Sequence, residues 1–353
     1  MNRNELQKLL QRVITIKRVV TTTILLFVIP IVIVGEFVAI YALFPGPKAP
    51  SESVVVEIPK GKSTREIGKI LAEAGVIHED IRFLLLAKIS GYAGRLQAGE
   101  FKLETGKRPL VVLKTLATAR SIQYSITIPE GLRATEIATL FGEGGWCDPR
   151  GFAGLVADKQ FIARLGLAGL DSLEGYLYPE TYLLTKDARG EEKIIGLMVS
   201  RFTKVWTEVT VDLEEKPDRE KTIILASIVE KETATPSERP LIAGVFRNRL
   251  QLGMRLQSDP TVVFGLVNHS GPITREDLLT ATPYNTYVIA GLPAGPICNP
   301  GKESILAVLR PTPTKDLYFV SKNDGTHHFS AALTEHNNAV QKYQRKKNCG
   351  NGK

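Results

Sequence analysis

The sequence predicts an α+β protein with one N-terminal transmembrane helix, a strand–helix region after it, and a mixed α+β domain at the end. Three observations lead to this fold class. Residues 19–44 are almost continuously apolar, a strand–turn–helix pattern occurs at 58–67 and again at 128–137, and amphipathic helical segments then alternate with short strands. A chain of 353 residues allows two or three modest domains. Its 43% hydrophobic and 23% charged residues are typical of a folded protein.

The N-terminal segment combines a basic flank with a long apolar run. Residues 1–18 carry several Lys and Arg residues and a single acid, whereas residues 19–44 contain one charge, Glu36. A helix of this length can cross a hydrocarbon core of about 30 Å. A cleaved signal peptide is the alternative, but the run is longer than its usual apolar core and no small-x-small site follows. The basic flank predicts a cytoplasmic tail at 1–18, a single pass through the inner membrane, and a periplasmic or extracytoplasmic remainder.

Strand, turn and helix signals recur seventy residues apart. Residues 58–67 and 128–137 share Ile, Pro, Gly, Glu and Ile at equivalent positions. After a stiff Pro- and Gly-containing linker at 45–52, we therefore expect a strand–helix region at 53–145. Its units resemble LysM modules, which bind glycan chains containing N-acetylglucosamine. A packing unit without a ligand is the alternative interpretation.

Two acids follow an apolar stretch in the segment 220–233, which is predicted to be a helix. Residues 223–229 are almost free of polar side chains, and Glu230 and Glu232 come directly after them. A carboxyl group set against apolar surroundings loses hydration, so its pKa rises and it can deliver a proton near neutral pH. The two acids lie about 200° apart on a helix, and only one can face a given cleft. Periodicity does not decide between them.

Polar side chains follow this helix in the segment 255–262. Arg255, Gln257 and Asp259 occupy alternate positions, so all three would point the same way from an extended strand. The segment is either a solvated edge or one wall of a polar groove.

Further candidate ligand groups lie in three segments rich in aromatic or turn-forming residues. In 173–182, tyrosines mixed with acids indicate either core packing or a sugar-binding wall. Loops such as 282–287 and 291–301 often hold ligand groups. The candidates in these segments are Glu174, Tyr176, Tyr284, Asn285 and Asn299.

Several function classes are excluded by what the sequence lacks. It contains no G-x-S-x-G elbow, Walker loop, G-x-G-x-x-G after a strand, or H-E-x-x-H motif. His327 and His328 would point to opposite faces of a strand, and the three cysteines show no metal-ligand spacing, so no metal or cofactor is predicted. A net charge of +8 suits an anionic membrane or wall polymer, while no nucleic-acid reader motif is present. Acid–base work by a carboxyl in a polar groove remains, which indicates glycoside cleavage.

The chain contains the motifs LEGYLYPETY, SIVEKET, RLQSDPTV, PYNTY, GLPAGPI and LYFV in this order. Their sequences and their order resemble those of the endolytic murein transglycosylase (YceG-like) family. The resemblance covers residues 53–343 and implies a catalytic domain, which we place at 146–345. The basic end of the chain, 346–353, is expected to be a disordered tail. The resemblance implies that Glu232 is the catalytic acid, with Thr233 fitting the Ser or Thr that follows it in lytic transglycosylases. Ala294 departs from the proline found in many relatives.

The resemblance also implies a mechanism and partners. Glu232 would protonate the bond between N-acetylmuramic acid and N-acetylglucosamine in nascent peptidoglycan, and would then deprotonate the muramic C6 hydroxyl, which closes a 1,6-anhydro end. This cleavage would end glycan elongation, near penicillin-binding protein synthases. Two alternatives stay open: a hydrolytic muramidase that needs a second carboxyl, Asp259 or Glu174, and a non-catalytic wall-binding scaffold. The groups expected to position the sugars are Arg255, Gln257, Tyr284 and Asn285.

Overall fold

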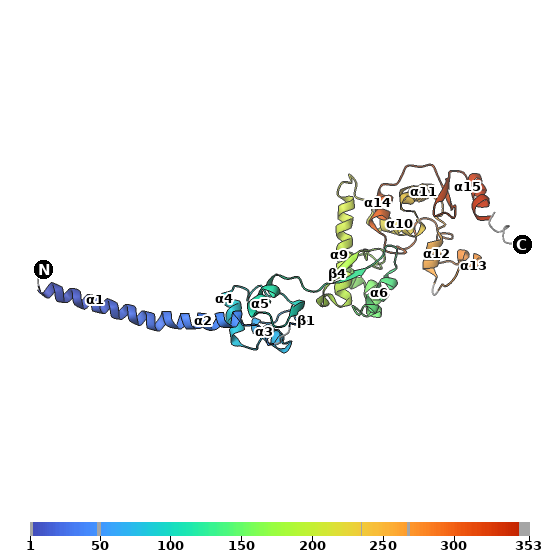
Figure 1. Ribbon diagram of the computed structural model, residues 1–353. Helices are drawn as coiled ribbons and strands as arrows, with labels where there is room; N and C mark the ends of the chain where they lie inside the picture. The colour runs from blue at the N-terminus through green and yellow to red at the C-terminus, as the bar shows by residue number, and fades with distance from the viewer. Residues whose placement is uncertain (1–2, 48–50, 234, 267–268, 346–353) are drawn as a thin grey trace. The chain divides into compact units, whose positions relative to one another are not determined.

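The computed structural model describes residues 3–47, 51–233, 235–266 and 269–345. The chain forms two compact units, residues 1–124 with 185–187, and residues 125–184 with 188–353 (Figure 1). Helices predominate in both, and the described strands pair as the two-stranded sheets β1–β2, β3–β4 and β5–β6. The predicted α+β class is confirmed. The predicted tail at 346–353 lies outside the described residues.

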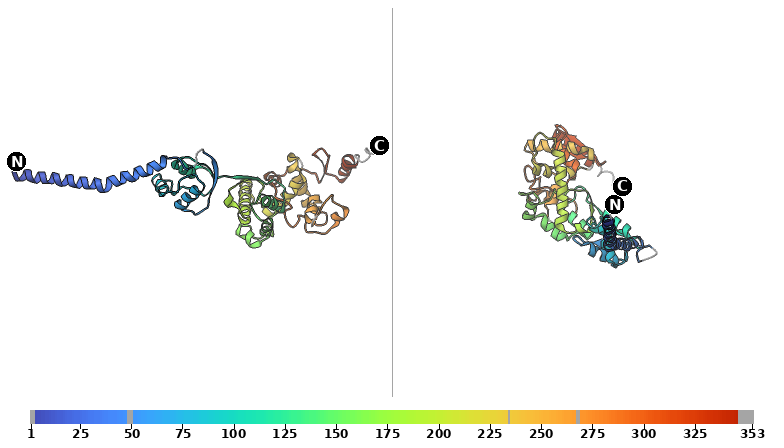
Figure 2. Two further views of the ribbon diagram at one scale, coloured as in Figure 1. Left: turned by 60° about the horizontal axis from the view of Figure 1, so that its bottom comes forward. Right: turned by 90° about the vertical axis from the view of Figure 1, so that its left-hand side faces the viewer.

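A continuous helix begins the first unit, shown in blue in Figures 1 and 2. It consists of α1 (Arg3–Thr23), a π-helical turn (Ile24–Val28) and α2 (Ile29–Leu43). The π turn precedes Pro30, whose ring and missing N–H disturb regular helical hydrogen bonding. Residues 8–43 include a window with a mean hydropathy of 2.7 and are long enough to cross a membrane.

The end of α2 belongs to the core of the first unit. Val38, Tyr41 and Ala42 are buried there, and the guanidinium of Arg82 lies over the ring of Tyr41 at 5.0 Å. The exposed apolar part of the predicted span is therefore mainly residues 19–37. At 1.5 Å per residue this part measures roughly 28 Å, close to the thickness of a hydrocarbon core.

The rest of the first unit has a βααβ order followed by one more helix. Antiparallel strands β1 and β2 pair with Val56 opposite Phe101, and both side chains are buried. Ser63 caps α3 in a capping box with Glu66, which confirms the predicted strand–turn–helix signal. The elements are β1 (Ser53–Ile58), α3 (Thr64–Glu73), α4 (Ile81–Ile89), β2 (Gly99–Glu104) and α5 (Pro109–Thr118).

The second copy of the repeated pattern lies in the second unit. Strand β3 (Tyr124–Thr127) pairs with β4 (Thr181–Leu184), and α6 (Ala134–Glu143) packs on α7 (Pro149–Val156). The boundary between the units therefore falls after residue 124 and not after residue 145, because strand and helix of this copy find their partners further along the chain.

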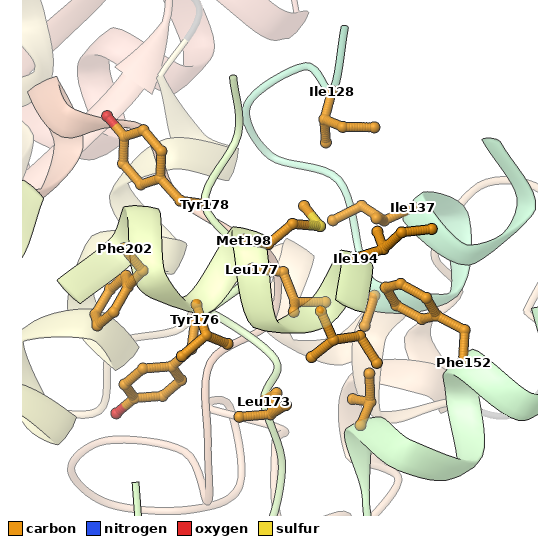
Figure 3. Close-up of a cluster of buried hydrophobic side chains, with 14 of the residues drawn as sticks. Ile128, Ile137, Phe152, Leu173, Tyr176, Leu177, Tyr178, Ile194, Met198 and Phe202 are labelled. Carbon is orange, nitrogen blue, oxygen red and sulfur yellow. The ribbon is translucent and has the colours of Figure 1, made fainter. Parts of the chain in front are cut away.

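One core of the second unit gathers side chains from α6, α7, α9 and the segment 173–178 (Figure 3). Tyr176 packs edge-to-face on Phe202, with ring centroids 4.8 Å apart. A second cluster of buried apolar residues lies among α10, α11 and α14. The remaining α-helices and strands of this unit are α8 (Lys159–Arg164), α9 (Glu191–Thr210), α10 (Arg219–Glu232), α11 (Arg239–Gln251), α12 (Asp259–Gly265), α13 (Arg275–Leu279), α14 (Lys302–Leu309), β5 (Tyr318–Ser321), β6 (His327–Ser330) and α15 (Leu333–Val340).

Candidate active site

Glu232 is the last residue of helix α10. Asp218 caps the start of the helix, and residues 222–229 are all buried, with Ile223 in one apolar cluster and Ile228 in the other. Because α10 packs against an apolar cluster on each side, its buried side chains point in several directions and the helix has no single apolar face. Glu232 lines a cavity of about 410 Å³ in the second unit, together with Arg249, Leu256, Gln257, Asp259, Tyr287, Phe319, Val320, Ser321, His327, His336, Val340 and Gln344.

The environment of Glu232 favours its protonated form. Burial raises the pKa of Glu232 from 4.5 to about 6, and the nearby charge of Asp259 adds to this rise. The Ser258 hydroxyl donates a hydrogen bond to Oε1 of Glu232 at 2.6 Å, and this hydrogen bond lowers the pKa of Glu232. Since Oε1 accepts from Ser258, Oε2 is the oxygen that remains to carry a proton. The half-buried carboxyl can therefore be an acid near neutral pH.

Glu230 is occupied by structural contacts. Its Oε1 accepts from Arg239 of α11 at 3.2 Å, and its Oε2 accepts from the backbone N–H of Gly301, which precedes α14, at 3.0 Å. Its side chain is 7% exposed, and it does not line the cavity. Periodicity did not decide between the two acids. The structure places Glu232 in the cavity and Glu230 at the contact between α10, α11 and the start of α14.

The segment 255–262 is not a strand. Residues 254–258 are irregular and α12 begins at Asp259, so the expected alternation of side chains does not occur. Gln257 has a φ of 50°, and it lines the cavity with Asp259. Arg255 is exposed and donates to the backbone oxygen of Tyr287 at 3.0 Å, outside the residues that line the cavity.

Asp259 is a second carboxyl in the same cavity. It accepts a hydrogen bond from the Tyr287 hydroxyl at 2.6 Å. Tyr287 was not among the residues selected from the sequence, although it stands in the PYNTY motif. Asp259 is thus held in place by a neighbouring donor while it faces the cavity.

Arg249 contributes a positive charge to the cavity wall. Its guanidinium donates to the backbone oxygens of Leu317 at 2.6 Å and Leu256 at 2.8 Å, and it lies over the Tyr318 ring. These contacts join α11 to β5 and to the segment that carries Gln257. The nearby charge opposes the rise in the pKa of Glu232 and can stabilise developing negative charge.

The β5–β6 hairpin brings a histidine to the cavity. The Nδ1 of His327 is 2.7 Å from Oε2 of Glu238, whose Oε1 accepts from the His327 backbone N–H at 3.0 Å. Because Nδ1 is paired with a carboxylate, Nε2 is the ring nitrogen left for the cavity. In the sequence, His327 was a candidate for metal ligation alone. In the described part of the chain, no group of three or more His, Cys, Asp or Glu side chains is placed to hold a metal ion.

Three of the predicted substrate-binding residues, Glu174, Tyr176 and Asn299, are buried away from this cavity. Glu174 accepts from the Ala134 backbone N–H at 3.0 Å and from Nδ2 of Asn299 at 2.8 Å. Oδ1 of Asn299 accepts from the Leu177 N–H at 2.9 Å. Tyr176 is 1% exposed in the apolar core. None of the three lines the cavity of Glu232. Glu174 and Asn299 connect the start of α6 to the segment 173–178.

The two candidates from the segment 282–287 also serve the fold. Asn285 is buried, its Nδ2 donates to the backbone oxygens of Asp277, Leu278 and Thr280, and its Oδ1 accepts from the Tyr287 N–H. Tyr284 packs edge-to-face on Phe264 at 4.7 Å. Neither lines the cavity of Glu232.

Fold and site together define a class, an α+β protein with an apolar N-terminal helix, a βααβ unit, and a helical unit whose polar cavity holds one hydrogen-bonded glutamic acid. The model of the YceG-like family matches residues 56–342. This chain belongs to the YceG-like family.

Individual relatives agree with this assignment. An endolytic murein transglycosylase of Bacillus subtilis is 33% identical over 323 residues, which cover 87% of this chain and 89% of the relative. One of Streptococcus pneumoniae serotype 2 is 30% identical over 322 residues, covering 82% of this chain and 58% of the relative. The crystal structure of a yceG-like protein from Listeria monocytogenes is 32% identical, has a TM-score of 0.55, and covers 82% of this chain and 99% of its own.

Proposed function

We propose that this chain is a membrane-anchored lytic transglycosylase that cleaves the bond between N-acetylmuramic acid and N-acetylglucosamine within nascent peptidoglycan strands. The observation that carries the proposal is the placement of Glu232, with its raised pKa, in a polar cavity. The curated relatives named endolytic murein transglycosylase support it.

In the proposed mechanism one carboxyl acts twice. Oε2 of Glu232 gives its proton to the glycosidic oxygen as the bond from muramic C1 to that oxygen breaks. The muramic C6 hydroxyl then attacks C1, and its proton returns to the Glu232 carboxylate. No water is consumed, and the product ends in a 1,6-anhydro ring. Asp259 and the carboxylate form of Glu232 stabilise the positive charge that develops at C1.

The N-terminal helix supports membrane anchoring. We place residues 1–18 in the cytoplasm, because their basic charges favour that side, and the two units outside the inner membrane. There the cavity would meet strands as they leave the glycan-polymerising penicillin-binding proteins.

Hydrolysis by water is the second candidate, because Asp259 shares the cavity with Glu232 and can activate a water molecule. Mass spectrometry of purified glycan strands after digestion separates the two reactions. We expect new muramic ends that are lighter by one water than hydrolysed ends. Ends of full hydrolysed mass would show a muramidase, and uncut strands would refute both.

A further inference from the structure

A second cavity adjoins the proposed cleavage site. It has a volume of about 360 Å³ and lies in the same unit. Asp259 lines both cavities, and Lys231, which lines the second, directly precedes Glu232. The second cavity is therefore a neighbour of the acid. Its lining residues are Arg133, Glu136, Lys231, Asp259, Pro260, Val263, Ile273 and Ile297.

The polar lining of this cavity combines two cations, Arg133 and Lys231, with two carboxylates, Glu136 and Asp259. Glu136 accepts from the backbone N–H of Arg133 at 2.7 Å, which closes the start of α6, and Asp259 accepts from the Tyr287 hydroxyl. Both acids are thus held in place by neutral donors and keep their charge, so the formal charges of the lining balance. The guanidinium of Arg133 lies over the Phe264 ring at 5.0 Å, which holds its orientation. The ammonium group of Lys231 donates to the backbone oxygen of Gly131 at 3.4 Å.

The rest of the lining is aliphatic. Pro260, Val263, Ile273 and Ile297 supply it, and no aromatic ring is among the lining residues. Sugar rings are bound by stacking on aromatic faces and by groups that pair with hydroxyls. Two cations and two acids beside an aliphatic surface instead suit a ligand that combines charged groups, carboxylates among them, with methyl groups.

The substrate of the proposed function carries such a ligand next to the reacting bond. In peptidoglycan a short peptide is attached through a lactyl group at C3 of the muramic sugar, two bonds from the C1 at which Glu232 would act. That peptide contains alanine methyl groups and free carboxylates. We propose that the second cavity binds the stem peptide of the muramic residue being cleaved, with Arg133 and Lys231 receiving its carboxylates and the aliphatic residues its methyl groups. This inference depends on the proposed function.

The test compares cleavage of two substrates by the full chain in detergent. One is a preparation of glycan strands with stem peptides, and the other is the same preparation after an amidase has removed the peptides. Arg133→Met and Lys231→Met each remove one cation with little change in length. Lys204→Met, an exposed position on α9 that lines neither cavity, is the matched control.

We expect each cavity variant to lower the ratio of kcat/KM on peptide-bearing strands to kcat/KM on stripped strands by roughly three- to tenfold. This is the effect of one charge-assisted hydrogen bond at a partly exposed site. The control should keep the wild-type ratio. If the wild type cleaves only peptide-bearing strands, a raised KM with unchanged kcat in the variants supports the inference.

Other outcomes overturn it. An unchanged ratio, or an equal loss on both substrates, contradicts peptide binding by the second cavity while leaving the proposed function intact, as does an unchanged KM where only peptide-bearing strands are cleaved. If the wild type cleaves neither substrate, the proposed function fails, and the inference fails with it.

Discussion

At the scale of single residues, the two glutamates at the end of α10 have different environments. Glu230 accepts from Arg239 and from the Gly301 N–H, whereas Glu232 accepts from the Ser258 hydroxyl and faces a cavity. Burial is what makes Glu232 a usable acid, because it raises the cost of the charged form. The proposed chemistry therefore depends on which of the two neighbouring acids forms no ion pair with the residues that the structure describes.

The pH dependence of cleavage should report the protonation of Glu232. Its pKa is raised to about 6, and the free enzyme must begin each turnover protonated. We expect kcat/KM to fall about tenfold per pH unit above that pKa. Since the hydrogen bond from Ser258 stabilises the carboxylate, Ser258→Ala should move this fall to higher pH. Initial rates across pH check both; a shift to lower pH would contradict the assigned contact.

Glu174 should link stability to pH. Burial raises its pKa from 4.5 to about 7, so the folded state favours the protonated form. Its stabilising contribution is present below pH 4.5 and is lost as the pH rises to about 7, by roughly 3 kcal/mol at most. Glu174→Gln should flatten that part of the pH dependence. Denaturant unfolding at several pH values measures it, and an equally steep curve for the variant would show that another group is responsible.

At the scale of elements, α10, α11 and α14 are joined through Glu230. Replacing Glu230 with Gln removes one of the two carboxylates paired with Arg239, which is 13% exposed, and leaves the more distant Glu130 as its ion-pair partner in the described part of the chain. We expect the free energy of unfolding to fall by roughly 1–3 kcal/mol. Cleavage by the folded protein should persist, because Glu230 does not line the cavity. Thermal melts and rates per folded molecule provide the check, and a stable but inactive variant would contradict this division of roles.

Local sequence signals predicted where strands, turns and helices form better than they predicted which strands pair with each other. The repeated Ile-Pro-x-Gly signal correctly predicted a turn at Gly61 and Gly131, where φ is +80° and +77°. It did not show that β1 pairs with β2 while β3 pairs with β4, because pairing depends on distant segments. The predicted boundary after residue 145 followed the similarity of the two copies and missed this difference.

The cavity was predictable only in part for a similar reason. Gln257 and Asp259 do line it with Glu232, but the left-handed turn at Gln257 and the start of α12 replace the expected strand. Polar residues in turn-rich segments, such as Asn299, can equally satisfy buried backbone groups, and sequence does not separate the two uses. Arg249 and His327 reach the cavity from distant elements, which no local pattern shows.

At the scale of the whole molecule, the apolar N-terminal helix has two functions in the structure. Residues 19–37 are largely exposed and apolar, and Val38, Tyr41 and Ala42 complete the core of the first unit. The proposed membrane span thus continues directly into a folded unit, without a flexible connection between them.

Truncation should reveal this dual use. A chain that begins at Phe37 keeps the buried side chains, whereas one that begins at Pro45 loses them. We expect the first unit of the shorter chain to be less stable by roughly 3–5 kcal/mol, comparable to truncating a large core side chain. Both chains should leave the membrane fraction. Equal melting temperatures would contradict a core role for the end of α2.

The most direct test of the central claim is the rate at which Glu232→Gln cleaves peptidoglycan, measured beside Glu230→Gln at the same concentration of folded protein. If Glu232 supplies the proton, its replacement should slow cleavage at least about a hundredfold, and Glu230→Gln should cleave at close to the wild-type rate. Wild-type cleavage by a folded Glu232→Gln variant would contradict the assignment of Glu232 as the catalytic acid.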